Sequence, residues 1–88
     1  MAWRIEISEA AVRDLKSFDP LIRKRIDKFL STRIPLFGDP RSLGTALQGS
    51  MSGFWRYRVG DYRILCRLVD ESQTIYVRRI AHRSQVYR

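Results

Sequence analysis

A strict alternation of side chains on both sides of Gly60-Asp61 constrains this chain more than any other feature. Apolar residues alternate with arginine over residues 54–59, and the alternation resumes over 62–69. A two-residue loop that begins with Gly is typical of a tight β-hairpin. Period-two alternation is typical of strands with one buried and one exposed face. The sequence therefore predicts two antiparallel strands joined at Gly60-Asp61.

A two-residue loop also fixes which residues face one another across the hairpin. Arg58 then lies opposite Arg63, Arg56 opposite Leu65, and Phe54 opposite Arg67. One face carries the apolar residues Trp55, Tyr57, Val59, Tyr62, Ile64, Cys66 and Leu68. The other carries four arginines, whose like charges repel at the short spacing of cross-strand neighbours. This arrangement favours an anion-binding face, and the alternative is that the arginines are simply solvated on the open face of a basic protein.

Four further segments complete the predicted fold. Alternation predicts a strand at residues 3–7, and Ser8 is a suitable N-cap for a helix that ends near Ser17. Asp19-Pro20 begins a second helix with apolar residues on one stripe to residue 30. Residues 34–53 are interrupted by Gly and Pro, with Leu43 and Leu47 spaced to anchor one helical turn on the core. A last strand is expected from Thr74 to about His82.

The order strand, two helices, three meandering strands predicts an α+β fold of two layers. We expect a mainly antiparallel four-stranded sheet with both helices packed on one face. The length of 88 residues predicts one domain that spans residues 1–88.

The facing of the last strand stays open at this stage. A four-residue loop at 70–73 places Tyr76, Arg78, Ile80 and His82 on the arginine face. An odd-length loop or a bulge instead places Val77, Arg79, Ala81 and Arg83 there. Either choice leaves one arginine on the helix side.

The charge balance narrows the class of partner. The net charge is +8, and 14 of the 17 basic residues are Arg. Residues 54–88 hold eight Arg against three acidic residues, a net charge of +5. Because Arg presents a planar fork of donors suited to phosphate and carboxylate, a polyanionic partner is expected: nucleic acid, an acidic protein or an anionic membrane surface.

The sequence gives little support for a metal site or for a membrane-spanning segment. One Cys and one His are too few for a metal site of the usual kind, so we expect no metal and no cofactor. Cys66 is expected to be a buried apolar residue. No apolar run is long enough for a signal peptide or a membrane span, which indicates a cytoplasmic protein.

The segment from Gly53 to Leu65, together with Ile80-Ala81-His82-Arg83 and the terminal Val86-Tyr87-Arg88, resembles the RelE/ParE superfamily of bacterial toxins. The resemblance covers the whole chain and is nearer to the RelE branch. It implies a type II toxin that cleaves mRNA in the ribosomal A site. It also implies an acidic antitoxin partner in a toxin–antitoxin hetero-oligomer, with no membrane involved.

The resemblance places the family's basic residues at Arg56, Arg58, Arg63 and Arg83 and its C-terminal aromatic residue at Tyr87. From the chemistry of the side chains we assign the following roles. Arg58 and Arg63 would bind the scissile phosphate, and Arg83 would stabilise it and protonate the leaving group. Arg56, Arg67 and Arg79 would bind neighbouring RNA. Placing Arg83 in the site favours the bulged register, with Arg78 at the helix edge.

Two further side chains are candidates for catalysis. Tyr87 is suited to stack on a base, or else is pinned to the core. His82 is a candidate general base, or else makes a structural hydrogen bond. Without a metal, the expected nucleophile is the 2′-OH of the RNA. Arg at positions 56 and 58, where some members carry Lys, stays charged and cannot act as a base.

Two other functions remain open from the sequence. One is a ParE-like toxin that inhibits gyrase and has no nuclease activity. The other is a non-catalytic basic module that binds RNA or protein.

Overall fold

The computed structural model describes residues 3–34 and 38–85, and its elements follow the predicted order. The helices are α1 (Glu9–Ser17) and α2 (Pro20–Lys28), and α2 continues into a π-helical turn, Phe29–Arg33. Two 3-10 turns follow at Pro40–Leu43 and Gly49–Met51. The strands are β1 (Arg4–Ile7), β2 (Thr45–Ala46), β3 (Trp55–Val59), β4 (Tyr62–Val69) and β5 (Thr74–His82).

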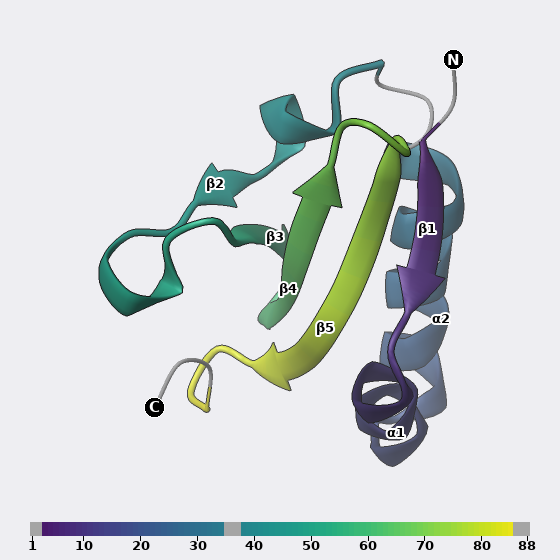
Figure 1. Ribbon diagram of the computed structural model, residues 1–88. Coiled ribbons are helices and arrows are strands. Elements are labelled where there is room, and N and C mark those ends of the chain that lie inside the picture. Colours follow the sequence, from purple (N-terminus) through teal and green to yellow (C-terminus); the bar gives the residue numbers. More distant parts are fainter. Residues whose placement is uncertain (1–2, 35–37, 86–88) are drawn as a thin grey trace.

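The strands form one sheet in the order β1-β5-β4-β3-β2 (Figure 1). β1 pairs with β5 in parallel, and every other pair is antiparallel. The predicted two-layer α+β fold is confirmed, but the sheet has five strands, not four. The additional strand, β2, pairs Thr45 with Arg56 and Ala46 with Trp55. Two residues are too few to produce a periodic pattern in the sequence, so this strand was missed.

Both helices pack against one face of the sheet (Figure 1). Helix α1 contributes Ala11 and Leu15, and α2 with its continuation contributes Ile26, Leu30 and Ile34. The sheet contributes the buried residues Tyr57, Ile64, Cys66, Ile75, Val77 and Ile80. This apolar layer leaves the opposite face of the sheet open, where the predicted arginines lie.

Both helices begin at the N-cap residues that the sequence predicts. The Ser8 side chain accepts a hydrogen bond from the backbone N–H of Ala11 at 3.1 Å. The Asp19 carboxylate accepts one from Leu21 at 2.9 Å, and Pro20 occupies the first turn of α2. These caps satisfy backbone donors that a helix leaves unpaired at its N-terminus. No helix in residues 3–34 or 38–85 has the length and apolar character needed to span a membrane.

The segment 38–53 is anchored to the core through Tyr57. The buried Tyr57 hydroxyl donates a hydrogen bond to the carbonyl of Pro40 at 2.7 Å. A Cβ on Gly44 would lie 3.1 Å from both the Tyr57 ring and the carbonyl oxygen of Arg56. Leu43 packs against the core as expected, but Leu47 is only half-buried and belongs to neither 3-10 turn.

A bulge decides the facing of β5. Leu65 pairs with Arg79 and Cys66 pairs with Val77, so Arg78 is the extra residue. Tyr76 therefore faces the same side as Arg67, and beyond the bulge Arg79 and Ala81 face that side. Arg78 was expected at the helix edge, and it lines a groove that reaches Ser8 and Ala10 at the start of α1. It borders grooves on the open face together with Arg67 and Arg79, because both residues of a bulge can point to one side.

Candidate functional site

Four arginines come together at the hairpin end of the open face. Arg58 and Arg63 are direct cross-strand partners, and Arg56 lies two residues before Arg58 on β3. Partial burial and the charges of Arg58, Arg56 and Arg83 lower the pKa of Arg63. Here we call Arg56, Arg58, Arg63 and Arg83 the arginine cluster. Mutual repulsion of this kind is relieved by an anion that binds among the cations.

Arg63 is held by the turn that precedes it. Its Nη1 donates to the carbonyls of Gly60 at 3.1 Å and Tyr62 at 3.0 Å. On β5 its partner is Ala81, whose methyl group is too short to cover a guanidinium. Within the described residues, the Nε and Nη2 of Arg63 donate to no protein group, so these donors are available to a ligand.

Arg83 follows the last residue of β5 and joins the arginine cluster from there. Its backbone N–H donates to the carbonyl of Asp61 at 2.7 Å, which ties it to the β3–β4 turn. Its side chain lies 3.7 Å from the Asp61 carboxylate and is largely exposed. This contact is long for a charge-assisted hydrogen bond and leaves the Arg83 guanidinium accessible to a stronger anion.

Arg56 carries an unsatisfied polar atom. Its Nε is buried and has no hydrogen-bond partner among the described residues. Buried polar atoms in folded proteins are nearly always paired, so an exception needs an explanation. An anion at the arginine cluster would pair with this Nε only after the Arg56 side chain turned outward.

Arg67 and Arg79 lie on the open face but already have partners. The Arg67 guanidinium stacks over Phe54, with 5.3 Å between its carbon and the ring centre. Arg79 forms a two-pronged ion pair with Asp14 of α1, at 2.9 and 3.1 Å. Of the three arginines predicted to bind RNA, Arg56 thus has an unsatisfied Nε, whereas Arg67 and Arg79 already contact other side chains of the protein.

Asp14 was not predicted to matter, and it joins α1 to the edge of β5. Its carboxylate also accepts the backbone N–H of Ile80 at 2.9 Å. Burial alone would raise the pKa of Asp14, but the hydrogen bonds from Arg79 and Ile80 together with the charges of Arg79 and Arg13 lower it. A single acid on a mixed helix face gives no sequence signal for a partner 65 residues away.

His82 lies on the other face of the sheet, apart from the arginine cluster. Its ring contacts Tyr62 edge-on, with ring centres 5.4 Å apart, and its Nδ1 lies 2.9 Å from the hydroxyl of Ser84. The bulge causes this facing, since it places the even-numbered residues after 79 toward the helices. Tyr87, the predicted stacking residue, lies outside the described residues.

The arginine cluster can bind and stabilise a phosphodiester, but it contains no group that titrates near neutral pH. Guanidinium groups stay protonated and supply fixed positive charge. Within the described residues, no group of three or more His, Cys, Asp or Glu side chains is arranged to hold a metal ion. The charges that the cluster offers are those of its guanidinium groups.

A two-layer α+β fold with a cationic cluster on its open sheet face defines a small basic domain. Comparison with known proteins identifies the family to which this domain belongs. The family model described as the ParE toxin of the type II toxin–antitoxin system, parDE, matches residues 5–87. The chain belongs to this family of toxins, within the RelE/ParE superfamily.

Individual relatives favour the RelE side of the superfamily. Toxin RelG of Mycobacterium tuberculosis is 32% identical over 100% of this chain and 99% of its own length. Toxin RelE of the same organism is 30% identical over 98% of this chain and 87% of its own. The crystal structure of the M. tuberculosis RelBE2 toxin–antitoxin complex includes a similar chain, with a TM-score of 0.86 and 27% identity over 93% of this chain and 99% of that one. The resemblance expected from the sequence is confirmed.

Proposed function

We propose that this toxin is a ribosome-dependent mRNA endonuclease that cleaves the message in the A site and so inhibits translation. The observation that carries the proposal is the arginine cluster, where Arg58 and Arg63 face each other on the open face. The identity to the RelG and RelE toxins supports the RelE-like assignment.

In the proposed reaction the 2′-OH of the RNA attacks the adjacent phosphorus. The P–O5′ bond breaks, leaving a 2′,3′-cyclic phosphate upstream and a 5′-OH downstream. Arg58 and Arg63 stabilise the charge that develops on the phosphate oxygens, which is the largest contribution a site without a base can make. Arg83 stabilises the phosphate on the leaving-group side, and Arg56 binds a neighbouring phosphate.

In the proposed reaction, the solvent and the ribosome take the proton from the 2′-OH and supply one to the leaving 5′ oxygen. Since His82 faces the helices, we assign it a supporting contact with Tyr62 and not the role of base. Tyr87 is proposed to stack on a base of the codon. The ribosome supplies the in-line orientation of the 2′-OH that the protein alone cannot impose.

We also propose an acidic antitoxin as the inhibiting partner. The net charge of +8 favours binding of a polyanionic chain. The similar M. tuberculosis structure is that of a toxin–antitoxin complex. A disordered acidic segment that folds on the toxin would neutralise the open face.

Induction in bacteria, with primer-extension mapping of mRNA ends, tests the proposed activity. We expect growth arrest, new 5′ ends within codons of translated regions, and rescue by the gene adjacent to the toxin gene. The Arg63→Ala variant should give neither arrest nor new ends. Harmless expression of the soluble wild-type protein would contradict the proposal.

A second candidate function is inhibition of gyrase, and the ParE description of the matching family model favours it. Purified protein that traps gyrase on DNA while translated mRNA stays intact would establish this alternative.

A further inference from the structure

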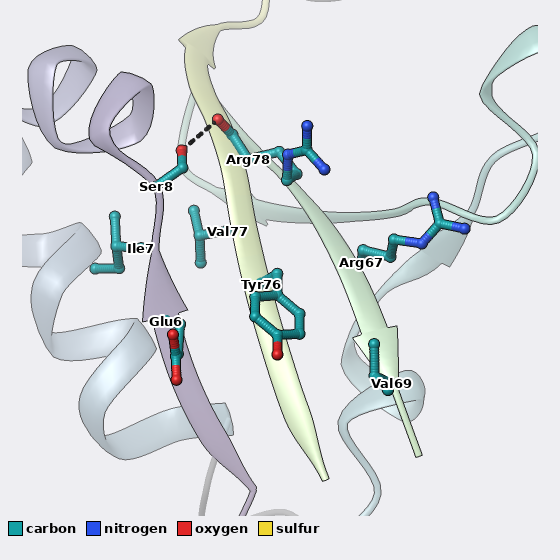
Figure 2. A pocket seen from close by; sticks show the side chains of 8 residues that line it. All are labelled: Glu6, Ile7, Ser8, Arg67, Val69, Tyr76, Val77 and Arg78. Carbon is teal, nitrogen blue, oxygen red and sulfur yellow. Dashed lines mark hydrogen bonds between the residues drawn. The ribbon is translucent and has the colours of Figure 1, made fainter. Parts of the chain in front are cut away.

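A groove of about 350 Å³ lies on the open face, away from the arginine cluster. It crosses β1, β5 and β4, and Figure 2 shows Tyr76 at its centre, between Glu6 on one side and Arg67 and Val69 on the other. Tyr76 is 38% exposed, although it is a large aromatic residue in the middle of a sheet. Tyr76 thus presents an aromatic ring to solvent beside the arginines Arg67 and Arg78.

A second groove lies between this groove and the arginine cluster. Arg78 borders both the Tyr76 groove and a second groove of about 250 Å³ that Phe54, Leu65 and Arg79 line. Leu65 pairs directly with Arg56 of the cluster. The two grooves and the cluster therefore follow one another along the open face of β4 and β5.

The spacing along β4 suits a nucleic-acid strand. Arg63 and Arg67 are four residues apart, or about 13 Å at the usual rise of a strand. Stacked nucleotides repeat at about 3.4 Å, so this distance corresponds to about four of them, or fewer where the strand is extended. An RNA of six to eight nucleotides could contact both ends.

The side chains around Tyr76 match the chemistry of single-stranded RNA. An exposed ring stacks on any base, and Arg67 and Arg78 flank it with charges for the phosphates. Glu6, held by Arg4 at 2.7 Å, presents a carboxylate that can accept from a base amino group. RNA offers both phosphates for Arg67 and Arg78 and a base for the Tyr76 ring, which favours RNA as the occupant.

We propose that the Tyr76 groove binds a nucleotide of the same RNA strand that the arginine cluster engages, a few nucleotides from the cleaved bond. This proposal rests on the proposed function, because it takes RNA as the substrate. Tyr76 provides a stacking platform, and Arg67 and Arg78 bind the flanking phosphates. The groove adds affinity and sets which segment of the message lies at the cluster.

Binding of a fluorescently labelled RNA octanucleotide with 2′-methoxy at every ribose tests the proposal, because this probe cannot be cut by 2′-OH attack. Anisotropy titration should give a Kd for Tyr76→Ala about 5- to 100-fold weaker than for wild type, the range expected for one lost base stack. Tyr76→Phe and Tyr76→Trp keep a ring and should bind within about twofold of wild type. Leu21→Ala, on the exposed surface of α2, is the matched control and should leave Kd unchanged.

A second measurement locates the strand. Photo-crosslinking of octanucleotides with 4-thiouridine at single positions should join one position to the Tyr76 peptide and another, several nucleotides away, to the Arg63 peptide. Crosslinks to the Tyr76 peptide from no position would overturn the proposal.

The outcomes separate this inference from the proposed nuclease activity. If ribosome-bound mRNA stays intact but Tyr76→Ala still weakens octanucleotide binding, the groove stands and the nuclease proposal fails. If mRNA is cleaved but a folded Tyr76→Ala protein binds the octanucleotide like wild type, the groove proposal fails. Loss of binding to an acidic antitoxin peptide alone, with RNA affinity unchanged, would likewise overturn it and identify a protein-binding groove.

Discussion

Arg58 on β3 and Arg63 on β4 are directly opposed in the sheet, and no carboxylate in the described residues forms an ion pair with either. Two like charges in adjacent positions do not stabilise a strand pair. In the proposed function, their placement on an otherwise well-packed hairpin supplies the concentrated positive charge that binding of a phosphate requires.

The first prediction separates this function from stability. Arg63→Ala should lower the cleavage rate on ribosome-bound mRNA by about 10²- to 10³-fold, the usual effect of losing one preorganised electrostatic contact. Its midpoint of thermal unfolding should be unchanged or higher, because the repulsion with Arg58 is removed. Arg83→Ala should slow cleavage similarly, and Lys24→Ala on the exposed surface of α2 should leave the rate unchanged. Equal effects of Lys24→Ala and Arg63→Ala would show that the open face is not the active surface.

The second prediction concerns Asp14, which joins α1 to β5. Asp14→Ala removes the acceptor for the Ile80 N–H and the partner of Arg79, and should lower the free energy of unfolding by roughly 1–3 kcal/mol. Denaturant unfolding measures the change. Asp27→Ala, at an exposed position on α2, is the matched control and should have little effect.

The same carboxylate makes stability depend on pH. Because the pKa of Asp14 is lowered in the folded chain from the ordinary 3.8, its contribution is complete above that value and is lost as the pH falls toward the lowered pKa. The unfolding free energy of the wild type should therefore fall more steeply on acidification below about pH 4 than that of Asp14→Ala. Parallel pH profiles for the two proteins would contradict this role.

The third prediction concerns the anchor of residues 40–44. Tyr57→Phe leaves the Pro40 carbonyl without its buried donor and should cost roughly 1–3 kcal/mol in unfolding free energy. Amide exchange in 40–44 should also accelerate. Tyr76→Phe removes a hydroxyl from an exposed tyrosine and serves as the control, for which no such change is expected.

The fourth prediction concerns Cys66. Its thiol is fully buried on the helix side of β4, and burial raises its pKa well above the usual range. Since the thiolate is the reactive form, native protein should react with a disulfide reagent only as fast as the chain opens. Reaction of the folded protein at the rate of the denatured one would contradict the packing of β4 against the helices.

The sequence predicted the hairpin well because its two-residue turn leaves one register, and each cross-strand pair from Val59–Tyr62 to Arg56–Leu65 is confirmed. Alternation alone allowed either face for the last strand, and the family resemblance favoured the bulged register, which is confirmed, but neither predicted that the bulge lies at Arg78. The bulge is also what turns His82 toward the helices, whereas the four-residue loop at 70–73 places Tyr76 on the arginine face. Contacts such as Asp14–Arg79 depend on how α1 packs against β5, and no local sequence pattern predicts this packing.

The most direct test of the account is cleavage of mRNA on purified ribosomes with 2′-methoxy in place of the 2′-OH at the single cleaved ribose. We predict that the unmodified message yields an upstream fragment with a 2′,3′-cyclic phosphate and a downstream fragment with a 5′-OH. The substituted message should occupy the ribosome equally and stay intact. Full cleavage of the substituted message, or upstream fragments that end in a plain 3′-OH, would contradict attack by the 2′-OH and would require an activated water as the nucleophile.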